Sequence, residues 1–213
     1  MELIYPFLPG ILLAYGAFLI GISSPGPNVL AVIGTSMSLG RKSGVGLALG
    51  VAGGSFCWAM LTVIGLSSLI ATYASALDII KILGGCYLLW LAFKAFRSAT
   101  SAHDIEAKAL SGGNRSFGRF ALRGFTIQMT NPKAALSWIA IISLGLTPNA
   151  PFWVGAVIVV GTAILSIVLH VLYAVAFSTP VMVTLYGKAR RFIQLTLGLF
   201  FAGAGAKLLL DRT

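Results

Sequence analysis

Acidic residues are scarce in this sequence. Its 213 residues include five aspartates and glutamates, against fifteen lysines and arginines and only two histidines. Acid–base enzymes and divalent-metal sites need clustered His, Asp or Glu side chains, and no such set recurs at helical spacing along the chain. We therefore expect no catalytic residues, no metal and no cofactor, and the chain is not interpreted as an enzyme.

Cysteine is equally rare. Cys57 and Cys86 lie inside separate apolar runs and form no C-x-x-C pair, so we interpret them as buried structural thiols. A membrane thiol-electron carrier needs cysteines at its functional centre. That function is therefore the less favoured alternative.

Charge of either sign is sparse, and apolar residues dominate. Charged residues make up 9% of the chain, hydrophobic residues make up 58%, and the mean hydropathy is +0.95, whereas soluble domains are about 25% charged. The chain is therefore predicted to be an integral membrane protein in contact with the lipid bilayer. The net charge of +10 comes from basic residues between the apolar runs, which indicates membrane topology and no nucleic-acid partner.

The apolar sequence divides into six segments, and we expect an all-α fold. The segments cover approximately 3–40, 44–71, 79–96, 117–146, 152–177 and 192–210. A polar linker at about 97–115 separates a first repeat, 1–96, from a second, 116–213, within a single transporter domain. The second segment carries a seam of small residues that allows close helix packing: Gly46, Gly50, Gly53, Gly54 and Ala59.

Two of these segments contain helix-breaking motifs. The first is interrupted by Ser-Ser-Pro-Gly-Pro-Asn at 23–28 and the fourth by Thr-Asn-Pro-Lys at 130–133. Proline lacks an N–H and clashes with the preceding helical turn, and backbone freed within a membrane must pack against protein or line a wet cavity. Proline-interrupted segments at corresponding positions of two halves point to the binding site of a secondary transporter.

Four stretches also carry a family resemblance. They are Ser-Pro-Gly-Pro-Asn at 24–28, Gly-Arg-Lys-Ser-Gly at 40–44, Gly-Cys-Tyr-Leu at 85–88 and Asn-Pro-Lys-Ala at 131–134. In this order, over nearly the whole chain, the sequence resembles the LysE/RhtB family of bacterial amino-acid exporters. The two proline motifs are the specific part. The resemblance implies efflux of amino acids or close derivatives from the cytoplasm, driven by the proton gradient.

The basic residues predict the orientation in the membrane. They follow the first segment, surround the linker and precede the sixth segment, whereas the loops at 67–76 and 147–151 have none. By the positive-inside rule, both termini lie outside and the two sets of three segments have opposite orientations, as a 3+3 inverted repeat. A shared Gly-x8-Lys spacing, Gly85 to Lys94 and Gly198 to Lys207, is a weak trace of that symmetry.

The two breaks supply the predicted substrate-binding residues. A helix that restarts after a break directs its N-terminal N–H groups at an anion, so a substrate carboxylate is expected there; a simple kink between packed half-helices is the alternative. Asn28 also suits the N-cap of the restarted helix. The predicted set is Ser24, Pro25, Gly26, Pro27, Asn28, Thr130, Asn131, Pro132 and Lys133.

Lys133 is the most informative single residue. It is the only charged residue between Arg123 and Lys188, and a cation within an apolar segment costs about 2.5–3.5 kcal/mol on insertion scales. We expect it to pair with the substrate carboxylate; a lysine that snorkels to the membrane interface is the alternative. Asn131 would cap its helix or contact substrate.

Two further residues are candidates for proton coupling. His170 lies well inside the fifth segment, and intramembrane histidines relay protons in some transporters; a neutral histidine bonded to a neighbouring helix is the alternative. Asp78 precedes Lys81 by three residues at the start of the third segment. For it, an exposed ion pair along the helix is the favoured interpretation.

These observations combine into one functional prediction. The chain is expected to be a multi-pass exporter of the bacterial inner membrane that moves small amino acids by alternating access. Export of another small solute or a cation on the same scaffold is the alternative, although no carboxylate lies at either break to hold a metal ion. The sequence is compatible with a homo-oligomer and does not identify the amino acid.

Overall fold

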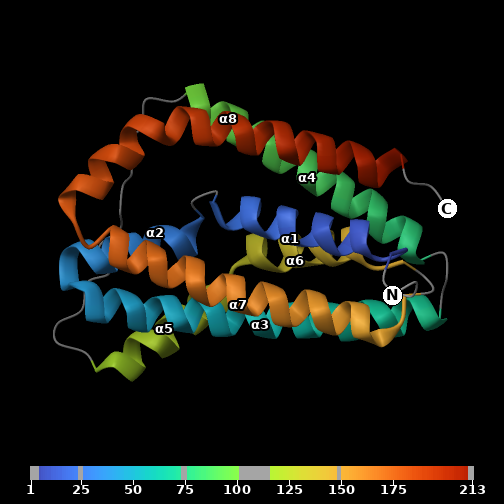
Figure 1. Cartoon of the computed structure of the whole chain (residues 1–213), viewed down its shortest axis with the longest axis horizontal. Helices are drawn as coiled ribbons and strands as arrows, with labels where there is room; N and C mark the ends of the chain where they lie inside the picture. The colour runs from blue at the N-terminus through green and yellow to red at the C-terminus, as the bar shows by residue number, and fades with distance from the viewer. Residues whose placement is uncertain (1–4, 24–25, 73–75, 101–115, 148–149, 211–213) are drawn as a thin grey trace.

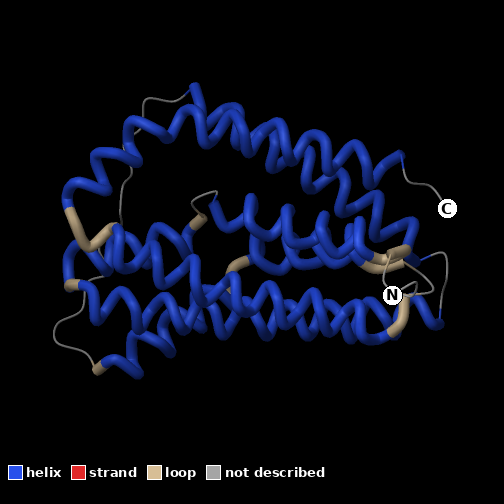
Figure 2. Tube along the Cα trace, viewed as in Figure 1, coloured by secondary structure: helices blue, strands red, loops and turns tan. Residues whose placement is uncertain are grey.

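The computed structural model describes residues 5–23, 26–72, 76–100, 116–147 and 150–210. All regular structure in these ranges is helical, so the predicted all-α fold is confirmed (Figure 2). The eight helices are α1 (Leu8–Ser23), α2 (Pro27–Leu39), α3 (Arg41–Thr72), α4 (Ala76–Thr100), α5 (Phe117–Met129), α6 (Pro132–Gly145), α7 (Phe152–Ala176) and α8 (Pro180–Leu210).

The helices run along a common axis in three layers (Figure 1). α4 and α8 lie side by side as one outer layer, α1 and α6 occupy the middle, and α3 and α7 form the opposite layer, with α5 packed against α3. α1 begins and α8 ends at the same end of the molecule. α1, which ends at the first motif, and α6, which begins at the second, are thereby held in the interior.

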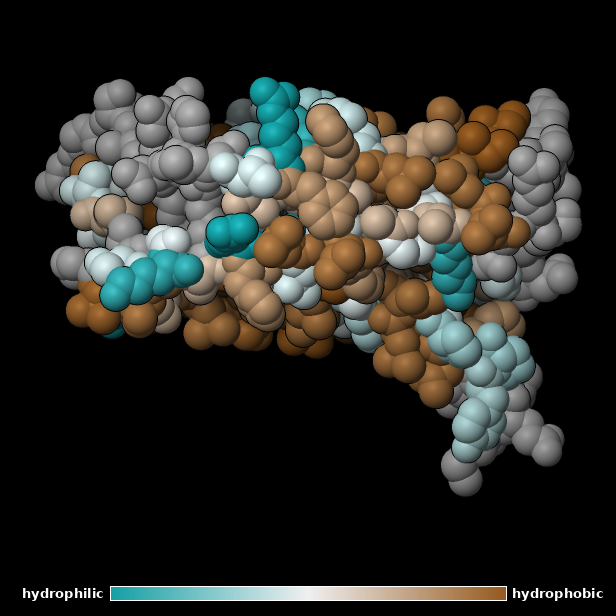
Figure 3. Space-filling model, turned by 90° about the horizontal axis from the view of Figure 1, so that it is seen from above, coloured by the Kyte–Doolittle hydropathy of each residue, from teal (hydrophilic) through white to brown (hydrophobic). Residues whose placement is uncertain are grey.

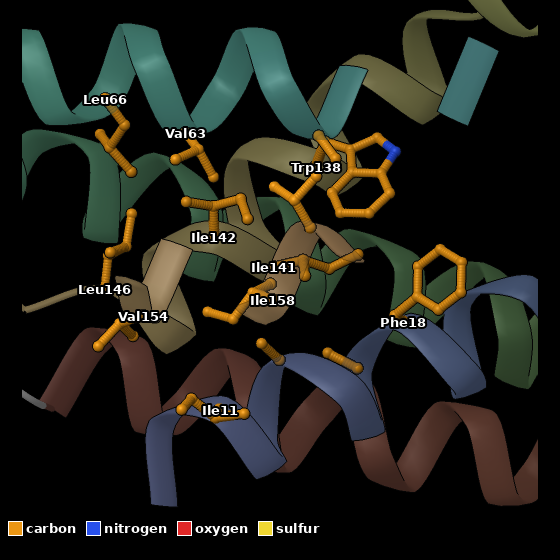
Figure 4. Close-up of a cluster of buried hydrophobic side chains, with 14 of the residues drawn as sticks. Ile11, Phe18, Val63, Leu66, Trp138, Ile141, Ile142, Leu146, Val154 and Ile158 are labelled. Carbon is orange, nitrogen blue, oxygen red and sulfur yellow. The ribbon is translucent and has the colours of Figure 1, made fainter. Parts of the chain in front are cut away.

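The main apolar core lies between α1, α3, α6 and α7 (Figure 4). Ile142 and Ile158 are fully buried in it, and the Phe18 ring packs at a tilt against that of Trp138, with 5.4 Å between the ring centroids. Lipid is as apolar as these side chains, so in a membrane close packing stabilises such a core more than the removal of apolar surface from water does. The core therefore anchors α1 and α6 against the rigid α3–α7 pair.

The outside of the molecule is apolar. On α7 the polar side chains Thr162, Ser166 and His170 are at most 1% exposed, whereas Val160 and Ile164 on the opposite side are each 57% exposed. Figure 3, seen from the α4–α8 side, shows apolar side chains over much of the coloured surface between the grey ends. Polar groups turned inward and apolar groups turned outward are the arrangement expected in lipid.

Helix lengths agree with a membrane protein. Four described helices, α3, α4, α7 and α8, contain stretches long and apolar enough to span a bilayer. α1 and α2 together make a fifth span if they count as one bent segment. α6 is apolar but, with 14 residues, shorter than the roughly 20 residues that a straight span needs.

The predicted seam of small residues packs α3 against α5. A β-carbon on Gly50 would collide with the carbonyl of Ala121, and one on Gly124 would collide with the carbonyl of Leu47. Gly53, by contrast, is exposed and more loosely packed, since a β-carbon there would lie 3.8 Å from the Phe125 ring of α5. Backbone contact at two glycines brings the end of α5, and with it the second break, close to α3.

Three boundaries or placements differ from the sequence-based expectation. α8 begins at Pro180, well before the expected start at 192, because proline is favoured in the first helical turn, where its missing N–H is not needed. α4 continues to Thr100, into the stretch expected to be linker. Cys86 is exposed on the apolar surface and Cys57 only half-buried, so the prediction of buried thiols was wrong for Cys86.

Candidate functional site

The first motif separates α1 from α2. α1 ends at Ser23 and α2 begins at Pro27, and the two helices are bent by 49° across the break. Gly26 occupies the N-cap position of α2 in an extended conformation. Asn28, expected as the cap, instead lies in the first turn of the helix, because Pro27 with its fixed φ already fills the first helical position. Its side chain is therefore free to reach another helix.

The second motif separates α5 from α6. α5 ends at Met129, and the Asn131 side chain caps α6 by accepting a hydrogen bond at 3.0 Å from the Lys133 backbone N–H. Pro132 is the first residue of α6. Capping, one of the two roles predicted for Asn131, is confirmed. Both α2 and α6 thus begin with a proline, and each presents an N-terminus with its partial positive charge.

The fold brings the two motifs together. The Asn28 amide donates to Gln128 Oε1 at 2.9 Å, across one hundred residues of sequence. A β-carbon on Gly26 would lie 3.5 Å from Lys133 Nζ, so the ammonium of the second motif lies beside the backbone of the first. The indole of Trp58 on α3 donates to the Gln128 carbonyl at 3.1 Å and holds the end of α5 in place.

A pocket opens where the motifs meet. Its empty space, including the mouth, is about 480 Å³. Its lining includes polar and basic residues and apolar ones. They are Asn28, Ser55, Gln128, Asn131, Lys133, Ser137 and His170, together with Phe18, Gly21, Ile22, Val29, Ala134, Trp138 and Ile141. The pocket thus combines a cation and two helix N-termini with uncharged hydrogen-bonding side chains and an aromatic wall.

Lys133 sits in the first turn of α6 with neighbours from α4. The Tyr87 hydroxyl donates to the Lys133 carbonyl at 3.1 Å, and its ring stacks at 5.6 Å on Trp90. The five carboxylate residues of the chain, Glu2, Asp78, Asp104, Glu106 and Asp211, have no described side chain. Among the groups that the structure describes, Lys133 therefore has no anionic partner.

His170 is buried in α7 at the edge of the pocket. The side chain is 1% exposed, and Nδ1 lies 2.9 Å from the carbonyl of Ser166 one turn earlier. Because a carbonyl only accepts, Nδ1 carries a hydrogen and donates it. Nε2 has no hydrogen-bond partner among the residues described. In the neutral imidazole that nitrogen is an unused acceptor.

Comparison with known proteins places the chain in a family. The sequence model of the LysE type translocators matches residues 19–212. The chain belongs to the LysE type translocator family. It is 32% identical to the uncharacterized membrane protein YahN of Escherichia coli K12, over 90% of this chain and 85% of that protein. No solved structure matches significantly.

Two relatives carry a functional name. The chain is 29% identical to the threonine efflux protein of Escherichia coli K12, over 91% of this chain and 94% of that protein. The threonine efflux protein of Salmonella typhimurium matches with the same identity and coverage. Membership of this family makes the chain a membrane transporter, not an enzyme, as the sequence predicted.

The structure gathers only part of the predicted set in this translocator's pocket. Asn28, Asn131, Lys133 and His170 line it, and Gly26 lies against Lys133. Three members, Pro27, Thr130 and Pro132, are exposed, and the Thr130 hydroxyl bonds locally to the Thr126 carbonyl at 2.8 Å. Ser24, Pro25 and the Asp78 side chain lie outside the described residues.

Sequence reasoning missed Gln128, Ser55 and Trp138. Gln128 and Ser55 are 4% and 2% exposed, respectively, in apolar surroundings, and buried polar groups need a partner. Gln128 had one signal: it is an uncharged polar residue two positions before the second motif. Ser55 and Trp138 had none, since which side of a helix faces a pocket depends on packing.

Proposed function

We propose that this translocator exports amino acids or close derivatives from the bacterial cytoplasm. The observation that carries the proposal is the meeting of Lys133 with the N-termini of α2 and α6 in one pocket. An amino acid in lipid needs its carboxylate matched by fixed positive charge and its ammonium matched by acceptors. Two relatives named as threonine efflux proteins support the same substrate class.

The proposed substrate-binding groups divide by role. Lys133 and the two helix starts bind the carboxylate, with Asn28 and Asn131 beside it. The Gly26 backbone and the flanking Ser24, Pro25, Pro27, Thr130 and Pro132 keep the helices open. The aromatic wall of Phe18 and Trp138 lies where a small side chain would rest. Charge-matched binding in a partly dry pocket favours a zwitterion over a metal cation, which has no described carboxylate to bind.

We further propose six segments arranged as a 3+3 inverted repeat, with α1–α2 and α5–α6 each forming one broken span. The contacts of α4 with α8 support this. A β-carbon on Gly85 would lie 2.8 Å from Leu209, and one on Gly198 would lie 2.5 Å from Phe96. The same offset in sequence number relates Gly85 to Gly198 and Phe96 to Leu209. Each contact is therefore the repeat image of the other.

Our proposal of alternating access is based on helix contacts that do not obey this symmetry. α4 packs on α6 and α8 packs on α1, and the repeat images of these contacts are α8 on α2 and α4 on α5. Among the described helices, neither image makes a comparable contact. A symmetric scaffold with asymmetric contacts has a second, equivalent arrangement. We propose that the α4–α8 layer moves between two arrangements. In one, α4 packs on α6 and α8 on α1; in the other, α8 packs on α2 and α4 on α5.

The basic residues near helix ends indicate which side of the membrane is cytoplasmic. α3, α5 and α8 begin, and α4 ends, at the same end of the molecule (Figure 1), and basic residues cluster in these parts of the sequence. By the positive-inside rule, that end is cytoplasmic in the inner membrane and both termini are outside. We propose that the proton gradient drives export, with His170 the favoured coupling residue and Asp78 the less favoured one.

The test is a transport assay with purified protein in proteoliposomes. Labelled amino acids, including L-threonine, are loaded individually, and release is followed with and without an inward proton gradient. We expect saturable release of at least one small amino acid, accelerated by the gradient. Release of another class of small solute, with none of the amino acids transported, would replace the proposal by the alternative substrate on the same scaffold.

A further inference from the structure

We propose that the substrate ammonium and the coupling proton compete for one atom, Nε2 of His170. This inference rests on the proposed function and adds a residue-level mechanism of exchange to it. Substrate binds when the imidazole is neutral and accepts from the ammonium. A proton on the same nitrogen removes the acceptor and repels the ammonium, so one site carries either substrate or proton.

The geometry assigns the tautomer. Nδ1 is 2.9 Å from the Ser166 carbonyl and 3.2 Å from the Ser166 hydroxyl, and the carbonyl compels Nδ1 to be the donor. The lone pair of the neutral ring is then on Nε2. A buried acceptor without a partner costs free energy, and Nε2 is such an atom among the described residues. A donor from the adjoining pocket would satisfy it.

Lys133 and His170 line the same pocket from different helices, α6 and α7. A zwitterion bound with its carboxylate at Lys133 directs its ammonium away from that cation. Among the described lining residues, His170 is the acceptor that can also bind a proton, because the amide oxygens of the lining accept hydrogen bonds but do not titrate. A charged imidazole, by contrast, would add a second cation to a pocket that already holds Lys133.

Other titratable groups lie on α7 and on the helices around it. The helices packed against it are α1, α2, α3 and α6. α2 has no titratable side chain, and the Tyr15 hydroxyl of α1 already donates to the Val157 carbonyl at 2.6 Å. The remaining groups are Arg41, Lys42 and Cys57 of α3, Lys133 of α6, and Tyr173 of α7 itself. Histidine is the side-chain type that ordinarily changes charge between about pH 5 and 8.

The cycle balances in mass and charge. A neutral imidazole binds one zwitterion from the cytoplasm and releases it outside. Nε2 then takes one proton from the outside, the protein returns to its inward-facing form, and the proton leaves to the cytoplasm. Each cycle exports one neutral molecule and imports one positive charge. Exchange of substrate for substrate, by contrast, needs no proton.

This difference gives the experiment two readouts. Proteoliposomes are assayed for exchange of labelled L-threonine, or of the panel member that wild type exchanges fastest, and for accumulation driven by a pH gradient. For wild type we expect the half-saturation concentration for exchange to rise once the pH falls below the pKa of the imidazole, approaching about tenfold per pH unit there, while the maximal rate holds. The assay therefore extends to acidic pH. This part needs no variant and tests the competition directly; a half-saturation concentration independent of pH overturns it.

His170→Gln separates the two roles of the imidazole. The amide oxygen still accepts a hydrogen bond but binds no proton. We expect exchange at a reduced rate, a half-saturation concentration that no longer depends on pH, and loss of gradient-driven accumulation. His103→Gln, in the sequence between α4 and α5, is the matched control and should behave as wild type.

The outcomes are distinct. Gradient-driven accumulation retained in His170→Gln shows that another group carries the proton and overturns the inference, although amino-acid transport stands. A wild-type protein that exchanges no amino acid overturns the proposed function and this inference with it.

Discussion

Lys133 places a full positive charge beside the backbone of Gly26 and in the first turn of α6. The N-termini of α2 and α6 add partial positive charge to the same region. Such a concentration of one sign in an apolar bundle is costly unless an anion balances it. We interpret the substrate carboxylate as that anion. Its binding would balance the positive charge of the pocket.

Replacement of Lys133 separates charge from shape. Lys133→Met keeps most of the apolar stem, so insertion should be unimpaired, while substrate binding should weaken by about 2–5 kcal/mol, typical of removing one member of a buried charged pair. Lys133→Arg should be intermediate, because it keeps the charge with a different reach. The measurement is transport normalised to inserted protein. A snorkelling lysine predicts near-equal rates for all three proteins.

Gln128 links the two motifs through a single side chain. It accepts from Asn28 at 2.9 Å, and its β- and γ-carbons pack against the backbone of Gly54 on α3. This amide therefore fixes the orientation of the Asn28 side chain in the pocket.

Gln128→Leu should leave the Asn28 amide without a partner, at a cost of about 1–3 kcal/mol. We expect a lower melting temperature and a higher half-saturation concentration for transport. Thr126→Val is the matched control on the same helix, because the Thr126 side chain is exposed and its hydroxyl donates to the Leu122 carbonyl of its own helix. Equal stability and equal half-saturation for the two variants would show that the amide bridge does not position Asn28.

At the scale of helices, α4 and α8 form an antiparallel pair that is closely packed at glycines. Gly85 and Gly205 meet backbone to backbone, since a β-carbon on Gly205 would lie 2.9 Å from the Gly85 carbonyl oxygen. Small residues that allow such approach stabilise helix pairs in lipid through dispersion contacts. The pair therefore behaves as one layer, with the repeat-related contacts of Gly85 and Gly198 along its length.

Alanine at Gly85 or Gly198 should destabilise the protein by about 1–3 kcal/mol through overpacking. Because the two contacts are repeat images, we expect losses of similar size. Gly203→Ala on α8 is the control: nothing lies within 4 Å of its β-carbon position, and alanine has the higher helix propensity. Thermal unfolding in detergent measures all three. If Gly85→Ala and Gly198→Ala are as stable as the control, the glycine contacts do not hold the layer together.

For the whole molecule, the arrangement of helix ends predicts its orientation. α1 begins and α8 ends at one end, near Lys81 and Lys207, whereas most of the basic residues belong to helix ends at the other. We expect single cysteines introduced beyond these two helices, at Glu2 and at Thr213, to react with an impermeant thiol reagent added outside intact cells. The background for this assay is a variant without Cys57 and Cys86. Labelling only after the inner membrane is opened would reverse the topology.

Much of the architecture was predictable because hydropathy and helix breaking are local properties. The sequence directly shows apolar runs long enough to span lipid, the prolines of the two motifs and the isolated charge of Lys133. The start of α8 was not, since Pro180 both ends one apolar run and begins the next helix. The same residue type allows both interpretations, and Lys188, Arg190 and Arg191 separate the short apolar stretch after Pro180 from the segment at 192–210.

The sequence by itself determined the membrane class, the helical fold, the two motifs and the isolated charge of Lys133 in the second of them. Only the tertiary structure decided that Gln128 joins Asn28, that Lys133 lies against Gly26, and that Nε2 of His170 has no partner in the described part of the chain. The physical reason is rotation: a helix forms from its own residues, but the direction each side chain faces depends on how neighbouring helices pack.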